Sequence, residues 1–240
     1  MSIIAIIPAR YNSSRFPGKP LADIKGKSMI QRVYEQAKGI DRIERVIVAT
    51  DDKRIFDHCV DFGAEVMMTS ENHRNGTERI AEVIDSIKEQ YDAVVNIQGD
   101  EPFIKLEQLN LICDIIENND TDIASLAKEI EDTVDVDSPN TVKVVMNERG
   151  KALYFSRFAI PYNRNDNNDV IRFKHIGLYA YKTKILKEII KLPESKLEVS
   201  ESLEQLRWLE AGYTINMGIT TYDSHGIDTP KDLEKAIKEL

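Results

Sequence analysis

Three cations in the first loop of the chain are the residues with the clearest chemical potential. Arg10, Arg15 and Lys19 follow an apolar run at residues 3–7, with serines and a glycine between them. Positive charge, hydroxyl donors and a backbone that a ligand can approach closely are what a polyphosphate requires. The spacing is not that of a Walker A loop, because Gly-x-x-x-x-Gly-Lys-Ser/Thr is absent. The loop therefore predicts a polyphosphate site, with a solvated basic loop as the alternative.

Two aspartates far apart in the chain are candidates for holding a metal ion beside that loop. Asp100 follows an expected strand at 93–97 directly, which places it at the same edge of the sheet as the cations. A carboxylate facing a polyphosphate needs a cation between them, and Mg²⁺ bound by one or two carboxylates plus phosphates is the common solution. Asp228, in Gly-Ile-Asp-Thr-Pro, is the second candidate.

Both aspartates also have plainer interpretations. Asp100 follows a glycine, and a Gly-Asp pair is adequate as a turn with no ligand. Asp228 or Thr229 can cap the last helix, with Pro230 at its first position, and the local sequence favours the cap.

Other polar residues carry weaker signals. The segment Asn-Gly-Thr-Glu-Arg at 75–79 opens an expected helix, with Thr77 as a reasonable N-cap, and helix N-termini favour anionic or polar ligands. Arg79 in that segment can equally be a surface charge. Each of the remaining candidates is, taken alone, more often a structural residue than a ligand: Arg157, His175, Tyr179, Glu204 and Gln205.

Alternating strands and helices must position these side chains. In the first half, apolar runs predict strands at 3–7, 45–50, 64–68 and 93–97, separated by helices at 29–37, 53–62 and 77–90. We expect Pro8, which lacks an N–H, to end the first strand, and Asp51-Asp52 to cap the helix that follows them. This alternation predicts an α/β fold: a mostly parallel central sheet with helices on both faces.

The second half is less regular. It predicts helices at 106–116, 200–210 and 230–239, and strands at 123–127, 141–145, 152–156, 176–181 and 214–217. The polar segment 163–169 predicts an exposed loop. We find no internal repeat or linker, and we expect a single domain over residues 1–240.

Composition excludes several classes of protein. The 240 residues are 42% hydrophobic and 30% charged, as expected of a soluble globular protein, and the net charge of −9 argues against a general nucleic-acid or anionic-membrane partner. Without a signal peptide or a bilayer-spanning apolar run, a cytoplasmic location is expected. The two cysteines, Cys59 and Cys113, fall in expected helices, and we expect buried, reduced thiols.

The motifs together resemble a known family. Ile-Pro-Ala-Arg-Tyr-x-Ser-x-Arg-x-Pro-Gly-Lys-Pro-Leu, then Ile-Val-Ala-Thr-Asp, is similar to the start of the 3-deoxy-manno-octulosonate (Kdo) cytidylyltransferases, also called CMP-Kdo synthetases. The resemblance continues in order through the segments at 75–79, 96–102, 138–145, 152–161, 175–181, 203–207 and 226–230. The first loop alone also resembles other sugar nucleotidyltransferases, including CMP-sialate synthetases. The later motifs are more specific to the Kdo cytidylyltransferases.

The resemblance implies a nucleotide-diphospho-sugar transferase-like (Rossmann-like) fold and a cytoplasmic homodimer. The implied reaction joins CTP and Kdo to give CMP-Kdo and pyrophosphate for lipopolysaccharide biosynthesis, with Mg²⁺ as cofactor. Carried over by motif, the catalytic residues would be Arg10, Arg15, Lys19 and Asp100, and the Mg²⁺ ligands Asp100 and Asp228. The nucleotide would contact Ala9, Arg10, Ser13, Arg15, Lys19, Gly76 and Thr77. The sugar acid would contact Arg79, Gln98, Arg157, His175, Tyr179, Glu204 and Gln205.

Three alternatives remain open. The protein can be a cytidylyltransferase for an amino-Kdo or a sialic acid, or a nucleotide-binding regulatory protein that has lost catalysis. The regulatory protein is disfavoured because every candidate phosphate or metal ligand still has a side chain of the type that the chemistry needs. A glycosyltransferase is disfavoured because no Asp-x-Asp motif follows the fourth expected strand; Asp135-x-Asp137 occurs elsewhere.

Overall fold

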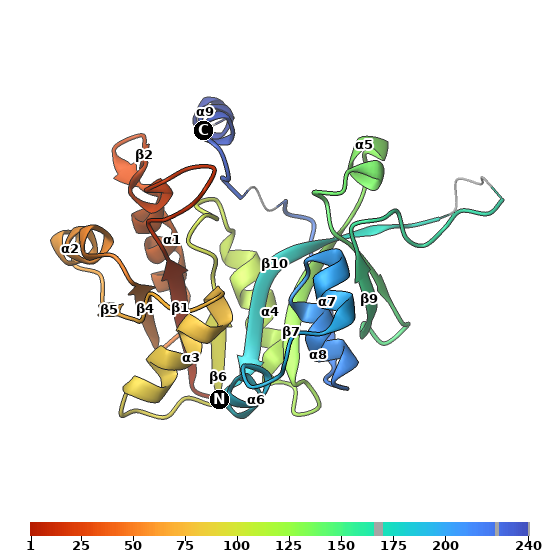
Figure 1. Cartoon of the computed structure of the whole chain (residues 1–240), viewed down its shortest axis with the longest axis horizontal. Coiled ribbons are helices and arrows are strands. Elements are labelled where there is room, and N and C mark those ends of the chain that lie inside the picture. Colours follow the sequence, from red (N-terminus) through yellow and green to blue (C-terminus); the bar gives the residue numbers. More distant parts are fainter. Residues whose placement is uncertain (166–169, 224–225, 240) are drawn as a thin grey trace.

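A single large sheet forms the centre of the protein (Figure 1). The computed structural model describes residues 1–165, 170–223 and 226–239. Seven strands cross the sheet in the order β11-β7-β10-β6-β1-β4-β5, and of these described strands only β10 runs opposite to the rest. Their bounds are β1 (Ile3–Ala9), β4 (Arg45–Thr50), β5 (Val66–Met68), β6 (Ala93–Asn96), β7 (Ile123–Glu129), β10 (Phe173–Lys182) and β11 (Ile215–Ile219).

Two further strands extend the sheet beyond this path. β8 (Lys143–Met146) pairs with β10, and β9 (Ala152–Ser156) pairs with β8. A separate two-stranded ribbon, β2 (Asp23–Ile24) and β3 (Lys27–Ser28), follows the short 3₁₀ helix η1 (Lys19–Leu21).

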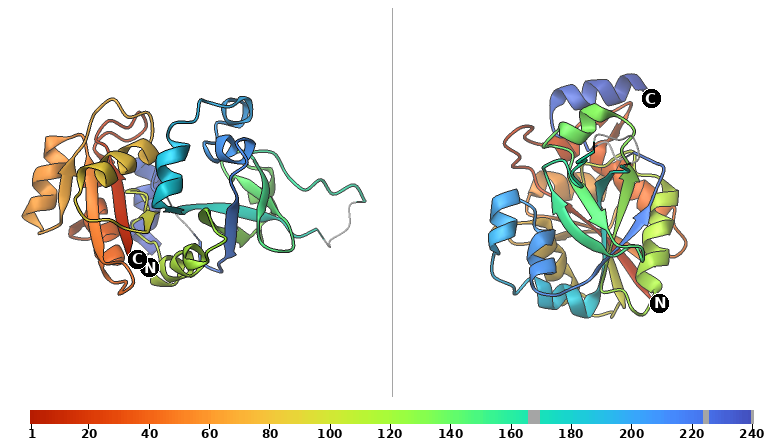
Figure 2. Two further views of the ribbon diagram at one scale, coloured as in Figure 1. Left: turned by 90° about the horizontal axis from the view of Figure 1, so that it is seen from below. Right: turned by 90° about the vertical axis from the view of Figure 1, so that its right-hand side faces the viewer.

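Helices cover both faces of the sheet, as the sequence predicts (Figure 2). Side chains of β1 alternate between two core clusters, with Ile3 and Ile7 on one face and Ile4 and Ile6 on the other. The first face packs against α1 (Met29–Lys38), α2 (Lys53–Asp61) and α4 (Leu106–Glu117). The second packs against α3 (Gly76–Ser86), α6 (Thr183–Ile189) and α8 (Gln205–Glu210). The remaining helices are α5 (Thr133–Asp137), α7 (Lys196–Glu201) and α9 (Pro230–Glu239).

The prediction that Pro8 ends the first strand is wrong. β1 continues to Ala9, and Pro8 pairs in register with Ala49 of β4. Ile6 faces β6, since its carbonyl accepts a hydrogen bond from the Ile97 N–H, and Pro8, two residues on, faces the same side. β6 has ended at that level, so the missing N–H of Pro8 interrupts no hydrogen bond between strands.

Two predicted helices also have different boundaries. The helix expected at 77–90 is α3, which begins one residue earlier, is capped by the Asn75 side chain, and ends at Ser86. The helix expected at 200–210 is divided into α7 and α8, because the chain turns at Ser202 with φ of 52°. The Glu201 carboxylate accepts hydrogen bonds from Ser156 Oγ and the Arg157 N–H, which ties the end of α7 to β9.

Several other expectations concern single features. Cys59 and Cys113 are buried free thiols, as predicted, and burial raises their pKa values to about 12 and about 11. Arg164 of the loop predicted at 163–169 is exposed, while 166–169 lie outside the described residues. Among the helices of the described segments, none is long and apolar enough to cross a membrane. The single-domain organisation stays a prediction.

Candidate active site

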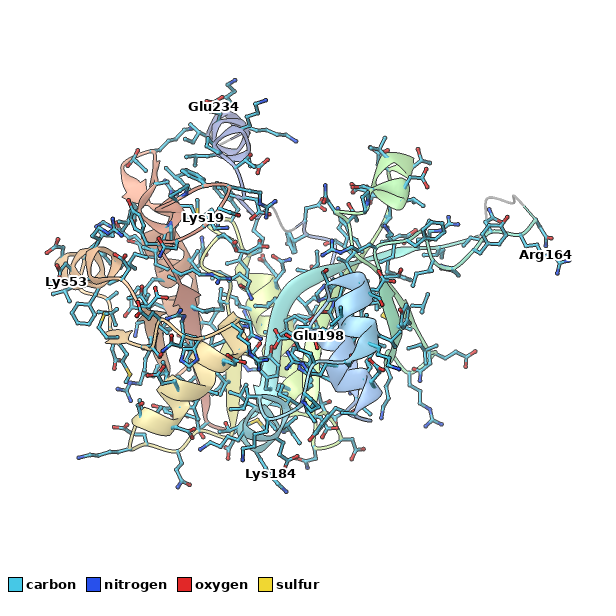
Figure 3. The ribbon with its side chains drawn as sticks, viewed as in Figure 1. Lys19, Lys53, Arg164, Lys184, Glu198 and Glu234 are labelled. Atoms are coloured by element: carbon cyan, nitrogen blue, oxygen red, sulfur yellow. The ribbon has the colours of Figure 1, made fainter. Side chains whose placement is uncertain are left out.

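A cleft of about 500 Å³ opens at the carboxyl ends of β1 and β6. These strands are neighbours in the sheet, so the loops that follow them lie side by side. Figure 3 shows Lys19 at this end of the molecule, beneath α9, and Lys184 at the opposite end. The lining consists of Pro8, Ala9, Arg10, Asn12, Ser13, Ser14, Arg15, Lys19, Pro20, His73, Asn75, Gly76, Arg79, Gln98, Gly99, Asp100 and Asp228. The structure thus brings the predicted cations and both predicted metal ligands to one cleft.

The basic loop is closed by its own backbone. The Tyr11 carbonyl accepts hydrogen bonds from the Ser13 N–H at 3.0 Å and the Gly18 N–H at 2.8 Å. Gly18 has φ of +73°, a conformation that favours glycine, and the Tyr11 ring lies where a side chain on Gly18 would begin. This closure holds Arg15 between fixed ends and starts η1 at Lys19.

Gly99 lets the two loops approach backbone to backbone. A Cβ atom placed on Gly99 would lie 2.9 Å from the Pro8 carbonyl oxygen, too close for either main chain to stay in place. The residue that follows is Asp100, so any shift of this loop also moves the carboxylate relative to the cations.

We expect Gly99→Ala to lower the free energy of unfolding by about 1–3 kcal/mol, the usual cost of overpacking a rigid contact. Urea unfolding measures the change. Gly177→Ala is the matched control, since a Cβ there meets nothing within 4 Å. Equal destabilisation by both substitutions would show that the contact with Pro8 is not the cause.

Two carboxylates from distant parts of the chain meet at one lysine. Lys19 Nζ lies 2.5 Å from Asp100 Oδ2 and 3.2 Å from Asp228 Oδ1, and it donates a third hydrogen bond to the Ile227 carbonyl oxygen at 3.3 Å. Arg15 Nη2 lies 2.9 Å from Asp228 Oδ2. Carboxylates and cations therefore alternate in the site, in the order Asp100, Lys19, Asp228 and Arg15.

The helix cap that competed for Asp228 is made by its neighbour. Thr229 Oγ1 accepts the Asp232 N–H at 3.2 Å, and Asp232 Oδ2 accepts the Thr229 N–H at 2.8 Å. Asp228 is therefore free to face the cleft, and its segment is fixed by buried Ile227, whose N–H donates to the Asp100 carbonyl oxygen at 2.9 Å.

This arrangement fits a magnesium ion that also contacts phosphates. No group of three or more His, Cys, Asp or Glu side chains within the described segments is placed to hold a metal. The two carboxylates that converge on one cation are nevertheless the usual protein contribution to a Mg²⁺ site, in which phosphates and water supply the other ligands.

Arg79, a predicted sugar ligand, lies buried in the wall of the cleft. Its Nη2 pairs with Asp51 Oδ2 at 2.6 Å, and its Nη1 donates to Thr69 Oγ1 and to the Ser70 carbonyl oxygen. The prediction that both aspartates after β4 serve as helix caps is therefore half right: Asp52 caps α2, whereas Asp51 pairs with Arg79. Most of the hydrogen-bonding capacity of this guanidinium is engaged within the protein.

Glu204 connects α8 to the start of α3. Its two carboxylate oxygens accept hydrogen bonds from Asn75 Nδ2 and Thr77 Oγ1, both at 3.0 Å. Burial raises the pKa of Glu204 to about 7, although the Thr77 hydrogen bond and the Arg207 charge lower it. Thr77 was predicted to contact the nucleotide, but in this structure it is directed to Glu204 and is not part of the cleft lining.

Of the remaining predicted sugar ligands, Gln98 lines the cleft and the others lie outside its lining. His175 Nε2 lies 3.0 Å from Ser125 Oγ, its ring packs against Phe155 and Tyr179, and burial lowers its pKa to about 4. Arg157 donates to the main-chain carbonyls of Pro139, Glu201 and Ser202. Six predicted ligands are not in the cleft lining: Thr77, Arg157, His175, Tyr179, Glu204 and Gln205. Their roles in binding the nucleotide or the sugar acid stay predictions.

Seven lining residues were not among the predicted sites, and four of them have polar side chains: Asn12, Ser14, His73 and Asn75. His73 comes from the loop before α3, and its Nε2 is hydrogen-bonded to Glu82 Oε2. Asn12 and Ser14 lie inside the basic loop, so their position next to the cations is a signal that the sequence offers. His73 carries no such signal.

A cationic loop at the end of the first strand of a Rossmann-like α/β sheet, with carboxylates opposite it, is suited to binding the phosphates of a nucleotide, and the comparisons with known proteins identify the class as nucleotidyltransferases. A sequence model of the cytidylyltransferase family matches residues 4–216. A protein of Parabacteroides distasonis named 3-deoxy-manno-octulosonate cytidylyltransferase is 53% identical over 249 residues, which cover 100% of this chain and 98% of that protein. One of the same name from Thermodesulfovibrio yellowstonii is 50% identical over 251 residues, covering 100% and 98%.

A solved structure leads to the same family. It is described as CMP:2-keto-3-deoxy-manno-octonic acid synthetase complexed with CTP, and it matches with a TM-score of 0.94 and 42% identity over 100% of both chains. This chain belongs to the 3-deoxy-manno-octulosonate cytidylyltransferase family, a family of enzymes.

Proposed function

We propose that this protein transfers the cytidylyl group of CTP to Kdo and releases pyrophosphate. The observation that carries the proposal is the meeting of Arg10, Arg15 and Lys19 with Asp100 and Asp228 in one cleft, in a chain of this family. The product, CMP-Kdo, is an activated sugar for lipopolysaccharide biosynthesis, and the proposed location of the enzyme is the cytoplasm.

The reaction is a displacement at phosphorus. The anomeric hydroxyl oxygen of the sugar acid forms a bond to the α-phosphorus of CTP, the bond to the bridging oxygen of the β-phosphate breaks, and the hydroxyl proton is released. Positioning and neutralisation of charge supply most of the rate in such transfers. Arg10 and Arg15 line the cleft and would stabilise the negative charge that grows on the leaving pyrophosphate.

Asp100 and Asp228 would hold Mg²⁺ in this proposal. When bound, the ion supplies positive charge to phosphate oxygens and lowers the pKa of an oxygen that it contacts. The carboxylates themselves fix the distance between the loop after β6 and the segment before α9, since both contact Lys19.

The sugar acid is proposed to lie deeper along the same edge of the sheet. Gln98 lines the cleft close to Asp100, and Glu204, the residue before α8, contacts the lining residue Asn75. A guanidinium is the expected partner of the sugar carboxylate, and of the two arginines predicted to contact the sugar acid, Arg79 and Arg157, Arg79 is the one in the cleft lining.

Pyrophosphate release from purified protein tests the proposed function. Release that requires CTP, Kdo and Mg²⁺ together would support it, and omitting each in turn gives the controls. If CTP gives pyrophosphate only with another sugar acid, that sugar acid replaces Kdo as the proposed substrate. The proposed phosphate-binding residues would then keep their role. Binding of CTP without release with any sugar acid would favour a regulatory protein.

A homodimer is part of the proposal, and an exposed apolar surface supports it. Residues 157–165 and 170–172, here called the arm, project from β9 and β10 away from the rest of the molecule, with Arg164 near the far end (Figures 1 and 3). Large apolar side chains on β9 and the arm are exposed: Leu153, Phe158, Tyr162 and Ile171. Several exposed large apolar side chains on one projecting part of the chain are consistent with an interface.

We expect Phe158→Asp to convert the dimer to a monomer, because a charge would be buried in the middle of an apolar contact. Light scattering coupled to size exclusion measures the mass. Val60→Asp on α2, also an exposed apolar residue, is the control and should leave the mass unchanged. A Phe158 variant with the wild-type mass would place the interface elsewhere.

A further inference from the structure

The ammonium group of Lys19 has no donor left for a ligand in this structure. An ammonium carries three N–H donors, and those of Lys19 go to Asp100 Oδ2, Asp228 Oδ1 and the Ile227 carbonyl oxygen. Its side chain is 14% exposed, so water does not replace these contacts easily. A lysine that is to contact a triphosphate must therefore first leave the carboxylates.

The same two carboxylates are those proposed to hold the metal ion. A Mg²⁺ ion and an ammonium cannot both lie between them, because two cations a few ångströms apart repel each other. Without either cation, Asp100 and Asp228 would repel each other, and among the described residues Arg15, on Asp228 Oδ2, would be the cation still paired with them. Either cation removes this repulsion, while the hydrogen bond from the Ile227 N–H to the Asp100 carbonyl oxygen keeps the segment before α9 against the loop after β6.

We propose that Lys19 is an exchangeable counter-ion: it occupies the metal site of the free protein and moves to the triphosphate when a divalent cation takes its place. The proposal rests on the proposed function, since it takes the triphosphate and the metal from there. Lys19 begins η1 at the end of the basic loop, so a change of its side-chain torsions transfers the ammonium between the carboxylates and the phosphate side of the cleft.

The exchange makes the binding of metal and nucleotide cooperative. A triphosphate attracts the ammonium and so vacates the carboxylates, and by thermodynamic linkage the metal strengthens nucleotide binding by the same factor. Lys19 thereby keeps the free enzyme from binding divalent cations tightly in the absence of nucleotide. A residue that only bound phosphate would have no such effect.

The test is the affinity of Mn²⁺ for the full-length protein without nucleotide, from the loss of the electron paramagnetic resonance signal of free Mn²⁺. We expect Lys19→Met to bind Mn²⁺ about tenfold more tightly than wild type or better, because a competing unit charge is removed from the site. Lys19→Arg keeps the charge and should remain close to wild type. Adding Asp100→Asn to Lys19→Met should abolish the gain, which places the bound ion at the carboxylates.

Lys128→Met is a matched control for loss of a lysine. Lys128 Nζ lies 2.5 Å from Asp223 Oδ2, the side chain is 13% exposed, and it is not in the cleft lining. This substitution should leave Mn²⁺ affinity unchanged. If the Lys19→Met protein is too unstable for titration, the rise in Tm on adding Mn²⁺ replaces it, and this rise should exceed that of wild type.

Two results would overturn the proposal. Unchanged Mn²⁺ affinity in Lys19→Met would mean that the ammonium does not compete for the site, and weaker affinity would mean that Lys19 only holds the carboxylates in place. Neither result touches the proposed reaction, which pyrophosphate release from wild type tests separately.

Discussion

Asp100→Ala is expected to lower kcat by about 10³-fold or more while the protein still binds CTP, because the carboxylate acts on charge that develops during the transfer. Asp100 lies next to Gly99 in the loop that packs on Pro8, and its carboxylate contacts Lys19 directly. The substitution removes one of the two proposed metal ligands, and among the described residues it leaves Asp228 as the carboxylate on that ammonium. Steady-state pyrophosphate release gives kcat, and calorimetric titration gives CTP affinity.

A surface aspartate serves as the control for this substitution. Asp114 on α4 is largely exposed and pairs with Arg42, so Asp114→Ala should keep wild-type kcat. Turnover close to wild type in Asp100→Ala would remove the metal role from that residue, whatever its effect on stability.

Arg15→Ala is expected to lower kcat/KM for CTP by about 10²-fold or more, the scale of losing one charged contact to a transition state. Arg15 is largely exposed, with 63% of its side chain accessible, and its contact with Asp228 is worth little to stability. We therefore expect kcat to fall with little change in Tm. Pyrophosphate release over a range of CTP concentrations separates kcat from KM.

Arg42→Ala is the matched control, since this arginine also pairs with exposed carboxylates but lies outside the cleft lining. A loss below tenfold in Arg15→Ala would contradict the triphosphate assignment of the basic loop. A loss confined to KM would mean that Arg15 binds CTP in the ground state and transition state equally.

The alternation of strands and helices could be predicted from the sequence because its signals are local. The apolar run at 3–7 marks a buried strand wherever it lies in a fold, and Asp52 caps α2 through its own neighbours. The order of motifs, read against a known family, also predicted which residue types would meet at the end of β1.

The predicted ends of strands and helices were wrong where contacts with a distant segment of the chain determine the local structure. Pro8 stays in β1 only because β6 has already ended beside it, and the sequence around Pro8 does not contain that fact. The predicted helix at 200–210 breaks at Ser202, where Glu201 is tied to β9. In each case a tertiary contact overrides a local preference, as is common for marginal signals.

The sequence by itself determined the fold class, the family and the chemistry available to the first loop. Only the tertiary structure decided that Asp228 faces the cleft while Thr229 caps α9, that Asp51 engages Arg79, and that Lys19 contacts a carboxylate 209 positions away. Side-chain type and helical or strand periodicity are properties of a short stretch of chain. The pairing of charges depends on which loops the sheet brings together, and that is fixed by strand order across the whole molecule.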